Sequence, residues 1–185
     1  MIDDLKSEVE NHMKKALEAM KHDFQAMRTG RASPSLVEPL KVDYYGTPTP
    51  LQQLATVSVP EARQILIKPY DTSQIKAIEK AILASELGLT PNNDGKVIRL
   101  SLPPLTEERR RDMVKLVKKR VEECHIAIRN TRHHGMKDLE EMEKEKMITE
   151  DQHKRGKEML EELTKKYVAE ADTMGKKKEA EVMEV

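Results

Sequence analysis

The feature that most constrains the fold is a helical pattern that runs over residues 106–147 without a proline. Thr106 is a good N-cap, and Glu107 and Glu108 place negative charge on the first turn, where the helix dipole favours it. Apolar or small residues then recur at alternating steps of three and four: Val114, Val117, Val121, Cys124, Ile128, Thr131, Gly135 and, one residue out of phase, Leu139 and Met142. Because so long and narrow a stripe cannot fold alone, other helices must cover it.

Similar stripes occur at both ends of the chain. Residues 1–29 carry apolar side chains at helical spacing and close at Thr29-Gly30, which suits a helix C-cap. Residues 149–183 begin with Thr149 and Gln152 at the spacing of a capping box. We therefore predict an elongated antiparallel bundle of three helices.

The stretch between the first two helices has a different pattern. Strand-like alternation occurs at residues 41–45, 55–59, 64–70 and 96–102, one helix is predicted at 73–87, and residues 91–95 read as a tight turn. The predicted fold class is α+β, with a bundle domain of residues 1–30 and 105–185 and an inserted α+β domain of residues 31–104. The two crossings, at residues 29–31 and 103–105, predict a hinge made of Gly30, Arg31, Pro103, Pro104 and Leu105.

Composition excludes several classes of protein. No apolar run approaches the roughly 20 residues of a membrane helix, and the start of the chain does not resemble a secretory signal. The one cysteine, Cys124, lies on the apolar stripe, so no disulfide can form within the chain and a reducing compartment is expected. We expect a cytoplasmic monomer without a membrane partner.

Charge is segregated along the long helix although the formal net charge of the chain is zero. Residues 107–137 hold ten basic and five acidic residues, and the balance reverses over 138–145. Arg129 and Arg132 lie one turn apart, with no acidic residue between Glu123 and Asp138 to pair with them locally. Two interpretations stay open: a solvated face with i,i+4 ion pairs, and a stripe that contacts phosphate. Because no aromatic residue lies near the stripe to stack on bases, an RNA partner would be structured RNA recognised by shape.

Catalytic patterns are weak. Cys124 and His125 are neighbours that cannot face each other on a helix, and His133, His134 and His153 lack the spacing of a metal site. No glycine-rich stretch matches a phosphate-binding loop. We expect no enzyme activity, no metal and no organic cofactor. A hydrolase that uses Cys124 would need that thiol exposed, and a non-catalytic helical adaptor or coiled-coil scaffold is the other alternative.

Several stretches together resemble the bacterial ribosome recycling factors over essentially the whole chain. They cover residues 28–36 (RTGRASPSL), 42–51 (VDYYGTPTPL), 88–95 (GLTPNNDG), 103–110 (PPLTEERR) and 128–132 (IRNTR). The resemblance implies an L-shaped, tRNA-like outline. It also implies a factor that enters the post-termination ribosome and, with elongation factor G and GTP, separates the subunits.

The resemblance also implies roles for individual residues. Arg132 and Arg129, with Asn130 between them, match the bundle's contact to large-subunit rRNA. Arg28, Arg31 and Arg110 are the basic residues of the motifs near the hinge. The chain departs from the family pattern after Arg132, where His133, His134 and Gly135 stand in place of Arg, an acidic residue and often Ala. A partly neutral His133 would weaken a phosphate contact, and Gly135 costs roughly 1 kcal/mol of helix propensity relative to Ala.

Overall fold

The computed structural model describes residues 1–27 and 29–184, which form two compact units. The helical unit comprises Met1–Phe24 and Arg111–Ala180, and the mixed unit comprises residues 25–110 with the last residues of the chain from Glu181. The domain limits expected at residues 30 and 105, and the hinge there, remain predictions. Among the described residues, no helix is both long and apolar enough to cross a membrane.

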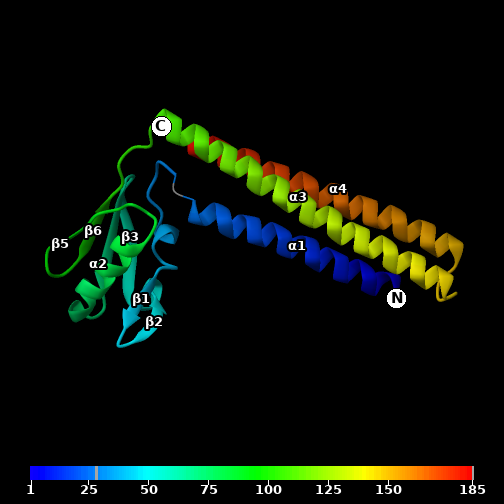
Figure 1. Ribbon diagram of the computed structural model, residues 1–185, viewed down its shortest axis with the longest axis horizontal. Coiled ribbons are helices and arrows are strands. Elements are labelled where there is room, and N and C mark those ends of the chain that lie inside the picture. The colour runs from blue at the N-terminus through cyan, green and yellow to red at the C-terminus, as the bar shows by residue number, and fades with distance from the viewer. Residues whose placement is uncertain (28, 185) are drawn as a thin grey trace. The chain divides into compact units, whose positions relative to one another are not determined.

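Three long helices, α1 (Ile2–Ala26), α3 (Glu107–Lys144) and α4 (Glu150–Met183), lie side by side (Figure 1). The N–H of Arg109 donates to Thr106 Oγ1 at 3.2 Å, so the predicted cap of α3 is confirmed. The predicted capping box of α4 is also confirmed, because Thr149 and Gln152 exchange hydrogen bonds of 2.8 and 3.2 Å.

The core of the helical unit is a narrow seam along all three helices. The seam predicted for the long helix is shifted near its start, where Met113 is buried and Val114 is half-buried. An α-helix turns once per 3.6 residues, so a strict heptad stripe drifts around it and neighbouring positions take over. The buried apolar side chains of the helical unit's three helices are Leu5, Val9, Met13, Leu17, Met20, Phe24, Met113, Val117, Cys124, Ile128, Leu139, Leu160, Leu163, Tyr167 and Ala171.

Glycines allow the helices of this unit to approach closely. A Cβ at Gly156 would lie 2.7 Å from a Leu139 methyl group, and one at Gly175 would lie 2.5 Å from a Val121 methyl group. At Gly135 the distance to Val9 would be 3.0 Å. Gly135 lowers the helix propensity of α3, as expected from the sequence. In return, the absence of a side chain at this position lets α3 pack closely against α1 and α4.

The mixed unit holds a four-stranded antiparallel sheet in the order β3-β4-β6-β5 and a separate hairpin. The sheet contains β3 (Ala55–Glu61), β4 (Gln64–Pro69), β6 (Ile98–Ser101) and β5 (Pro91–Asn93), and the hairpin pairs β1 (Lys41–Tyr44) with β2 (Thr47–Pro50). Helix α2 (Ile75–Ala84) packs into the same core. That core consists of Leu36, Val37, Val42, Leu51, Ala55, Ile65, Ile67, Ile75, Ile78, Ile82, Leu89, Ile98, Leu100 and Leu102.

Two strands of the mixed unit were not predicted from the sequence. Residues 47–50 and 91–93 contain Pro48, Pro50 and Pro91, which suggested turns. Both segments pair with one neighbour only, β2 with β1 and β5 with β6. An edge strand has a partner on one side and solvent on the other. Proline is tolerated there at positions whose N–H would face solvent, because no hydrogen bond to a neighbouring strand is lost. The predicted helix at 73–87 is also shorter in the structure, since a 3₁₀ turn, Thr72–Gln74, precedes α2.

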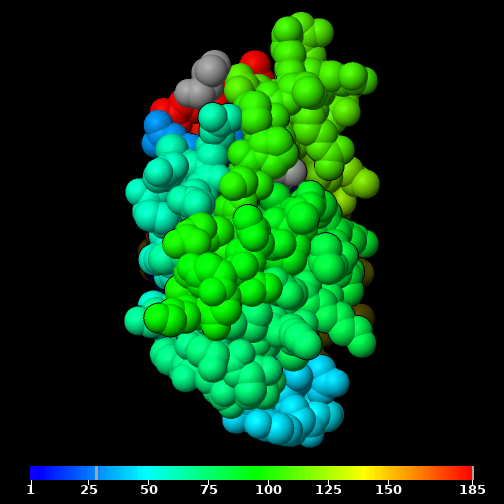
Figure 2. Space-filling model, turned by 90° about the vertical axis from the view of Figure 1, so that its left-hand side faces the viewer, coloured from blue at the N-terminus to red at the C-terminus, as the bar shows by residue number. Residues whose placement is uncertain are grey.

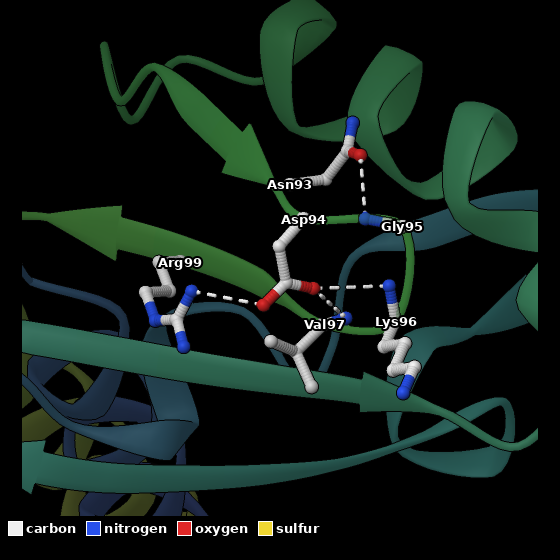
Figure 3. A network of polar contacts seen from close by, with 6 residues as sticks. All are labelled: Asn93, Asp94, Gly95, Lys96, Val97 and Arg99. Atoms are coloured by element: carbon white, nitrogen blue, oxygen red, sulfur yellow. Dashed lines mark hydrogen bonds and ion pairs between the residues drawn. The ribbon is translucent and has the colours of Figure 1, made fainter.

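The turn between β5 and β6 is held by one carboxylate, Asp94 (Figure 3). Its Oδ1 accepts the N–H groups of Val97 and Lys96 at 3.0 Å each, and its Oδ2 pairs with Arg99 Nη1 at 3.1 Å. These contacts, led by the Val97 N–H, lower the pKa of the Asp94 carboxyl. The loop therefore has a defined shape at neutral pH.

Candidate nucleic-acid interface

Arg129 and Arg132 project from an exposed edge of α3 whose opposite side is anchored in the seam. Ile128, next to Arg129, is fully buried, so the helix cannot rotate there without leaving its core. The Arg129 side chain is 52% exposed and that of Arg132 is 36% exposed. The two guanidinium groups are thus presented to solvent from a rigid element, as a contact to an anionic partner requires.

Both arginines have acidic neighbours that local sequence spacing did not reveal. Arg129 Nη1 lies 3.6 Å from Glu122 Oε1, and Arg132 Nη1 lies 3.8 Å from Glu161 Oε1 on α4. As expected, no acidic residue lies between Glu123 and Asp138 to pair with these arginines, but residues outside that stretch do pair with them. Both distances exceed those of a charge-assisted hydrogen bond, and such exposed pairs contribute about 0–1 kcal/mol. They hold the guanidinium groups near the edge while leaving donors free for phosphate oxygens.

The other predicted residues of this helix share the exposed surface. Asn130 and His133 are both exposed. The rings of His133 and His134 are 6.4 Å apart between centroids and tilted, so the adjacent histidines diverge as expected. The structure therefore groups Arg129, Asn130, Arg132 and His133 on one stretch of α3, which we call the α3 basic edge.

Arg31 and Arg110, the other predicted RNA contacts that the structure describes, belong to the mixed unit. The exposed Arg31 donates from Nη2 to Glu184 Oε1 at 3.0 Å. Arg110, near the start of α3, is half-buried, and its Nε has no hydrogen-bond partner among the described residues. Arg28 lies outside the residues that the structure describes. Of the predicted hinge residues, Leu105 is buried, Gly30 is half-buried, and Pro103 and Pro104 are exposed.

The far end of α3 has the opposite charge. A hollow of about 370 Å³ opens where the start of α1 meets the end of α3. Its lining includes the carboxylates of Asp4, Glu8, Asp138, Glu141 and Glu145. Phosphate would be repelled there, so the charge segregation predicted from the sequence persists in the folded helical unit.

Cys124 and His125, the neighbouring side chains considered above for catalysis, are respectively buried and paired with a carboxylate. Cys124 is 4% exposed, and burial raises the pKa of its thiol to about 11, so it is neither accessible nor ionised at neutral pH. His125, on α3, reaches toward α4, and its Nε2 lies 2.9 Å from Asp172 Oδ1. Over residues 1–27 and 29–184, no group of three or more His, Cys, Asp or Glu side chains could hold a metal ion.

A polar contact also joins α1 to α4 beside the seam. The hydroxyl of Tyr167 donates to Glu10 Oε1 at 2.7 Å, and Lys166 Nζ lies 3.4 Å from the same oxygen. Burial, together with this carboxylate, raises the pKa of Tyr167, while the hydroxyl lowers the pKa of Glu10. Local sequence spacing could not identify this contact, because the two residues are 157 positions apart.

Comparison with known proteins gives a consistent result over the full length. A model of the family described as "Ribosome recycling factor" matches residues 20–183. Ribosome-recycling factors of Chloroflexus aurantiacus and Roseiflexus castenholzii are 56% and 54% identical to this chain over 185 residues, covering 100% of both chains in each case.

Solved structures agree with the sequence matches. The solution structure of a ribosome recycling factor is 47% identical, with a TM-score of 0.82, and the match covers 100% of this chain and 98% of that one. A second match, 42% identical with a TM-score of 0.68, covers both chains completely. It comes from models for the T. thermophilus ribosome recycling factor and the E. coli elongation factor G bound to the E. coli post-termination complex. The predicted α+β class, a helical bundle with an inserted domain, is thereby confirmed.

Proposed function

The chain belongs to the ribosome recycling factor family, and from this we propose that it is a translation factor that splits post-termination ribosomes into subunits. In this proposal it binds large-subunit rRNA through the α3 basic edge and acts together with elongation factor G. One of the matched structures contains a recycling factor and elongation factor G on the post-termination complex, which supports both partners.

The proposed RNA contact rests on the exposure, pairing and anchoring of Arg129 and Arg132. The Arg129 side chain is exposed and the Arg132 side chain is half-buried. Both make loose ion pairs, and both stand on a helix that the buried Ile128 anchors. A bidentate guanidinium suits phosphate oxygens of a folded RNA, and the pairs with Glu122 and Glu161 are weak enough to be exchanged. A scaffold protein would need the buried seam alone and would leave this edge without a purpose.

We propose that the protein is not itself an enzyme and needs no cofactor. The energy for splitting would then come from GTP hydrolysis by elongation factor G. The buried, protonated thiol of Cys124 argues against the alternative of a hydrolase that uses this residue.

We also propose that the segments at residues 29–31 and 103–105 act as a hinge. Two short chain crossings, one with Gly30 and one with Pro103 and Pro104, are suited to absorbing a change in backbone angle while the flanking elements stay intact. A cross-link between the bundle and the inserted domain should leave ribosome binding intact and block splitting. Splitting at the normal rate by the cross-linked protein would show that motion is unnecessary.

The function is tested with purified post-termination ribosomes. Light scattering should show splitting only when this protein, elongation factor G and GTP are all present, and a non-hydrolysable GTP analogue should prevent repeated turnover. Efficient splitting by this protein alone, or none with the complete mixture, would refute the proposal.

A further inference from the structure

The turn between β5 and β6 contains the one position of the chain where a glycine follows an aspartate or an asparagine, Asp94-Gly95. At such a pair the backbone nitrogen of the glycine can attack the side-chain carboxyl carbon of the aspartate. Other residues hinder this attack with their Cβ atom, which glycine lacks. The turn therefore has the sequence that favours rearrangement of aspartate to isoaspartate.

The rearrangement needs no reactant other than water. A bond forms between Gly95 N and Asp94 Cγ, the nitrogen loses its proton, and one carboxyl oxygen leaves as water, which gives a five-membered succinimide ring. Water then opens this ring at one of its two carbonyl carbons. Opening at the backbone carbonyl leaves isoaspartate, with the main chain running through the side-chain carbons, and opening at the other carbonyl restores aspartate.

Hydrogen bonds of the folded turn oppose both parts of this attack (Figure 3). The Gly95 N–H, which must lose its proton, donates to Asn93 Oδ1 at 3.1 Å. The nitrogen must also approach the face of the carboxyl carbon, which requires the carboxylate to rotate. Asp94 Oδ1 accepts two backbone N–H groups at 3.0 Å each, and Oδ2 pairs with Arg99 at 3.1 Å. Rotation about the Cβ–Cγ bond would break these three contacts.

The ionisation of Asp94 also opposes the reaction. An ionised carboxylate is a poor electrophile, because its carbon carries less positive charge than the carbon of the neutral acid. The contacts of the turn, led by the Val97 N–H, lower the pKa of the Asp94 carboxyl in the folded state. At a given pH, the reactive neutral acid is therefore rarer in the folded turn than in the unfolded chain.

Burial does not protect the pair. The side chain of Asp94 is 46% exposed, and residues 92–96 are all exposed. Figure 2 shows green atoms, which include the segment from β5 to β6, on the surface of the mixed unit that faces the viewer. Because water reaches the turn freely, its hydrogen bonds are what restrains the reaction.

We propose that Asp94-Gly95 is a site of isoaspartate formation at which the hydrogen bonds of the β5–β6 turn suppress the reaction in the folded protein. The reaction proceeds when this edge of the sheet opens or when the carboxylate loses its contacts. Isoaspartate adds one carbon atom to the main chain between the paired residues Asn93 and Ile98, so the donors of the turn no longer meet their acceptors. Each modified molecule therefore records an opening of this edge.

Peptide mapping after incubation at neutral pH tests the site. The protein is incubated folded and in guanidinium chloride and is then digested. Chromatography separates the isoaspartyl from the aspartyl form of the peptide that contains position 94, and a methyltransferase specific for isoaspartyl carboxyl groups labels the former. We expect isoaspartate to form about tenfold more slowly, or slower still, in the folded protein, because the turn must open first.

The peptide that contains Asp71-Thr72 is the internal control for this experiment. Asp71 also lies in an exposed turn and accepts the Ser73 N–H, but the β-branched Thr72 hinders the attack, so this peptide should stay unmodified in both states. No isoaspartate at position 94 in the unfolded chain, or equal rates in the folded and unfolded protein, would overturn the proposal.

Two substitutions of Arg99 separate the contacts of the turn from folding in general. Arg99→Ala removes the contact to Asp94 Oδ2, so isoaspartate should form about two- to fivefold faster in the folded protein, the ratio that an exposed ion pair supports. Arg99→Lys keeps a cation at this position and should stay closer to the wild-type rate. Melting curves check that both variants are folded. A folded Arg99→Ala protein that is modified no faster than the wild type would overturn the proposal that these contacts suppress the reaction.

Discussion

The helical unit and the β1–β2 hairpin of the mixed unit differ in what they place on their surfaces. The helical unit buries a narrow seam and exposes charge almost everywhere else, with the α3 basic edge separated along one helix from an acidic end. The hairpin exposes two tyrosines and only two charged residues. The comparison teaches that this chain keeps its cationic surface and its exposed aromatic rings on different elements.

The largest effect should come from the seam that holds the α3 basic edge in place. Leu139 is fully buried and packs against Gly156, which has no side chain to fill a void. Leu139→Ala should therefore lower the free energy of unfolding by about 2–5 kcal/mol, measured by urea denaturation. Leu83→Ala, at a position 64% exposed on α2, is the matched control and should change it by less than about 0.5 kcal/mol. Equal small losses would show that the seam is not tightly packed.

A smaller effect should come from the α3 basic edge itself and should appear in binding only. Arg132→Ala should weaken ribosome affinity by roughly 1.5–3 kcal/mol, about tenfold to a hundredfold, because a charge-assisted contact to phosphate is lost. Its melting point should stay near that of the wild type, since the exposed pair with Glu161 contributes little. Co-sedimentation at fixed salt measures the affinity. Unchanged affinity would leave this edge as solvated surface.

The Tyr167–Glu10 contact should have the smallest effect, and its effect should depend on pH. Tyr167→Phe removes the hydroxyl that donates to Glu10 and should cost about 1–2 kcal/mol at pH 7. The pKa of Glu10 is lowered in the folded state, so the contact stabilises the fold above about pH 4.5 and stops doing so as the pH falls below that value. The pKa of Tyr167 is raised in the folded state, so the contact stabilises the fold below about pH 10 and loses this effect as the pH rises further.

Denaturation across pH measures this contact. The difference between the wild type and Tyr167→Phe should be constant from about pH 5 to 9 and should shrink on both sides. Lys166→Ala removes the 3.4 Å exposed contact to the same oxygen and the cation–π contact of Lys166 Nζ with the Tyr167 ring, but it leaves the hydroxyl bond in place. It is the control and should lower the free energy of unfolding by less than Tyr167→Phe does. A difference that grows with acid or base would contradict the assigned contact.

The sequence predicted those elements that depend on neighbouring residue types or on regular apolar spacing. The caps at Thr106 and Thr149 follow from residue types within one turn, and the stripes of the three helices follow from their spacing. The edge strands β2 and β5 were not predicted, because Pro48, Pro50 and Pro91 favour turns locally and only a partner strand makes them edges.

The surroundings of the α3 basic edge could be predicted only in part. The exposure of Arg129 and Arg132 follows from the phase of the stripe, whereas the approach of Glu161 depends on the register of α4 against α3. In an antiparallel helix pair, residues at equal distances before and after the connecting turn lie side by side. With the turn between Lys144 and Glu150, position 132 on α3 is therefore expected beside a position near 161 on α4. The stripe placed Gly135 on the packed side of the long helix, but residue spacing alone did not show how closely Val9 and Leu160 approach it.

The salt dependence of ribosome binding tests the central claim, that the α3 basic edge contacts phosphate, most directly. Co-sedimentation over a series of salt concentrations should give a plot of log affinity against log salt whose slope is shallower by about one unit in Arg132→Ala than in the wild type. Lys144→Ala, at the acidic end of the same helix, should keep the wild-type slope. Identical slopes for all three proteins would contradict the claim.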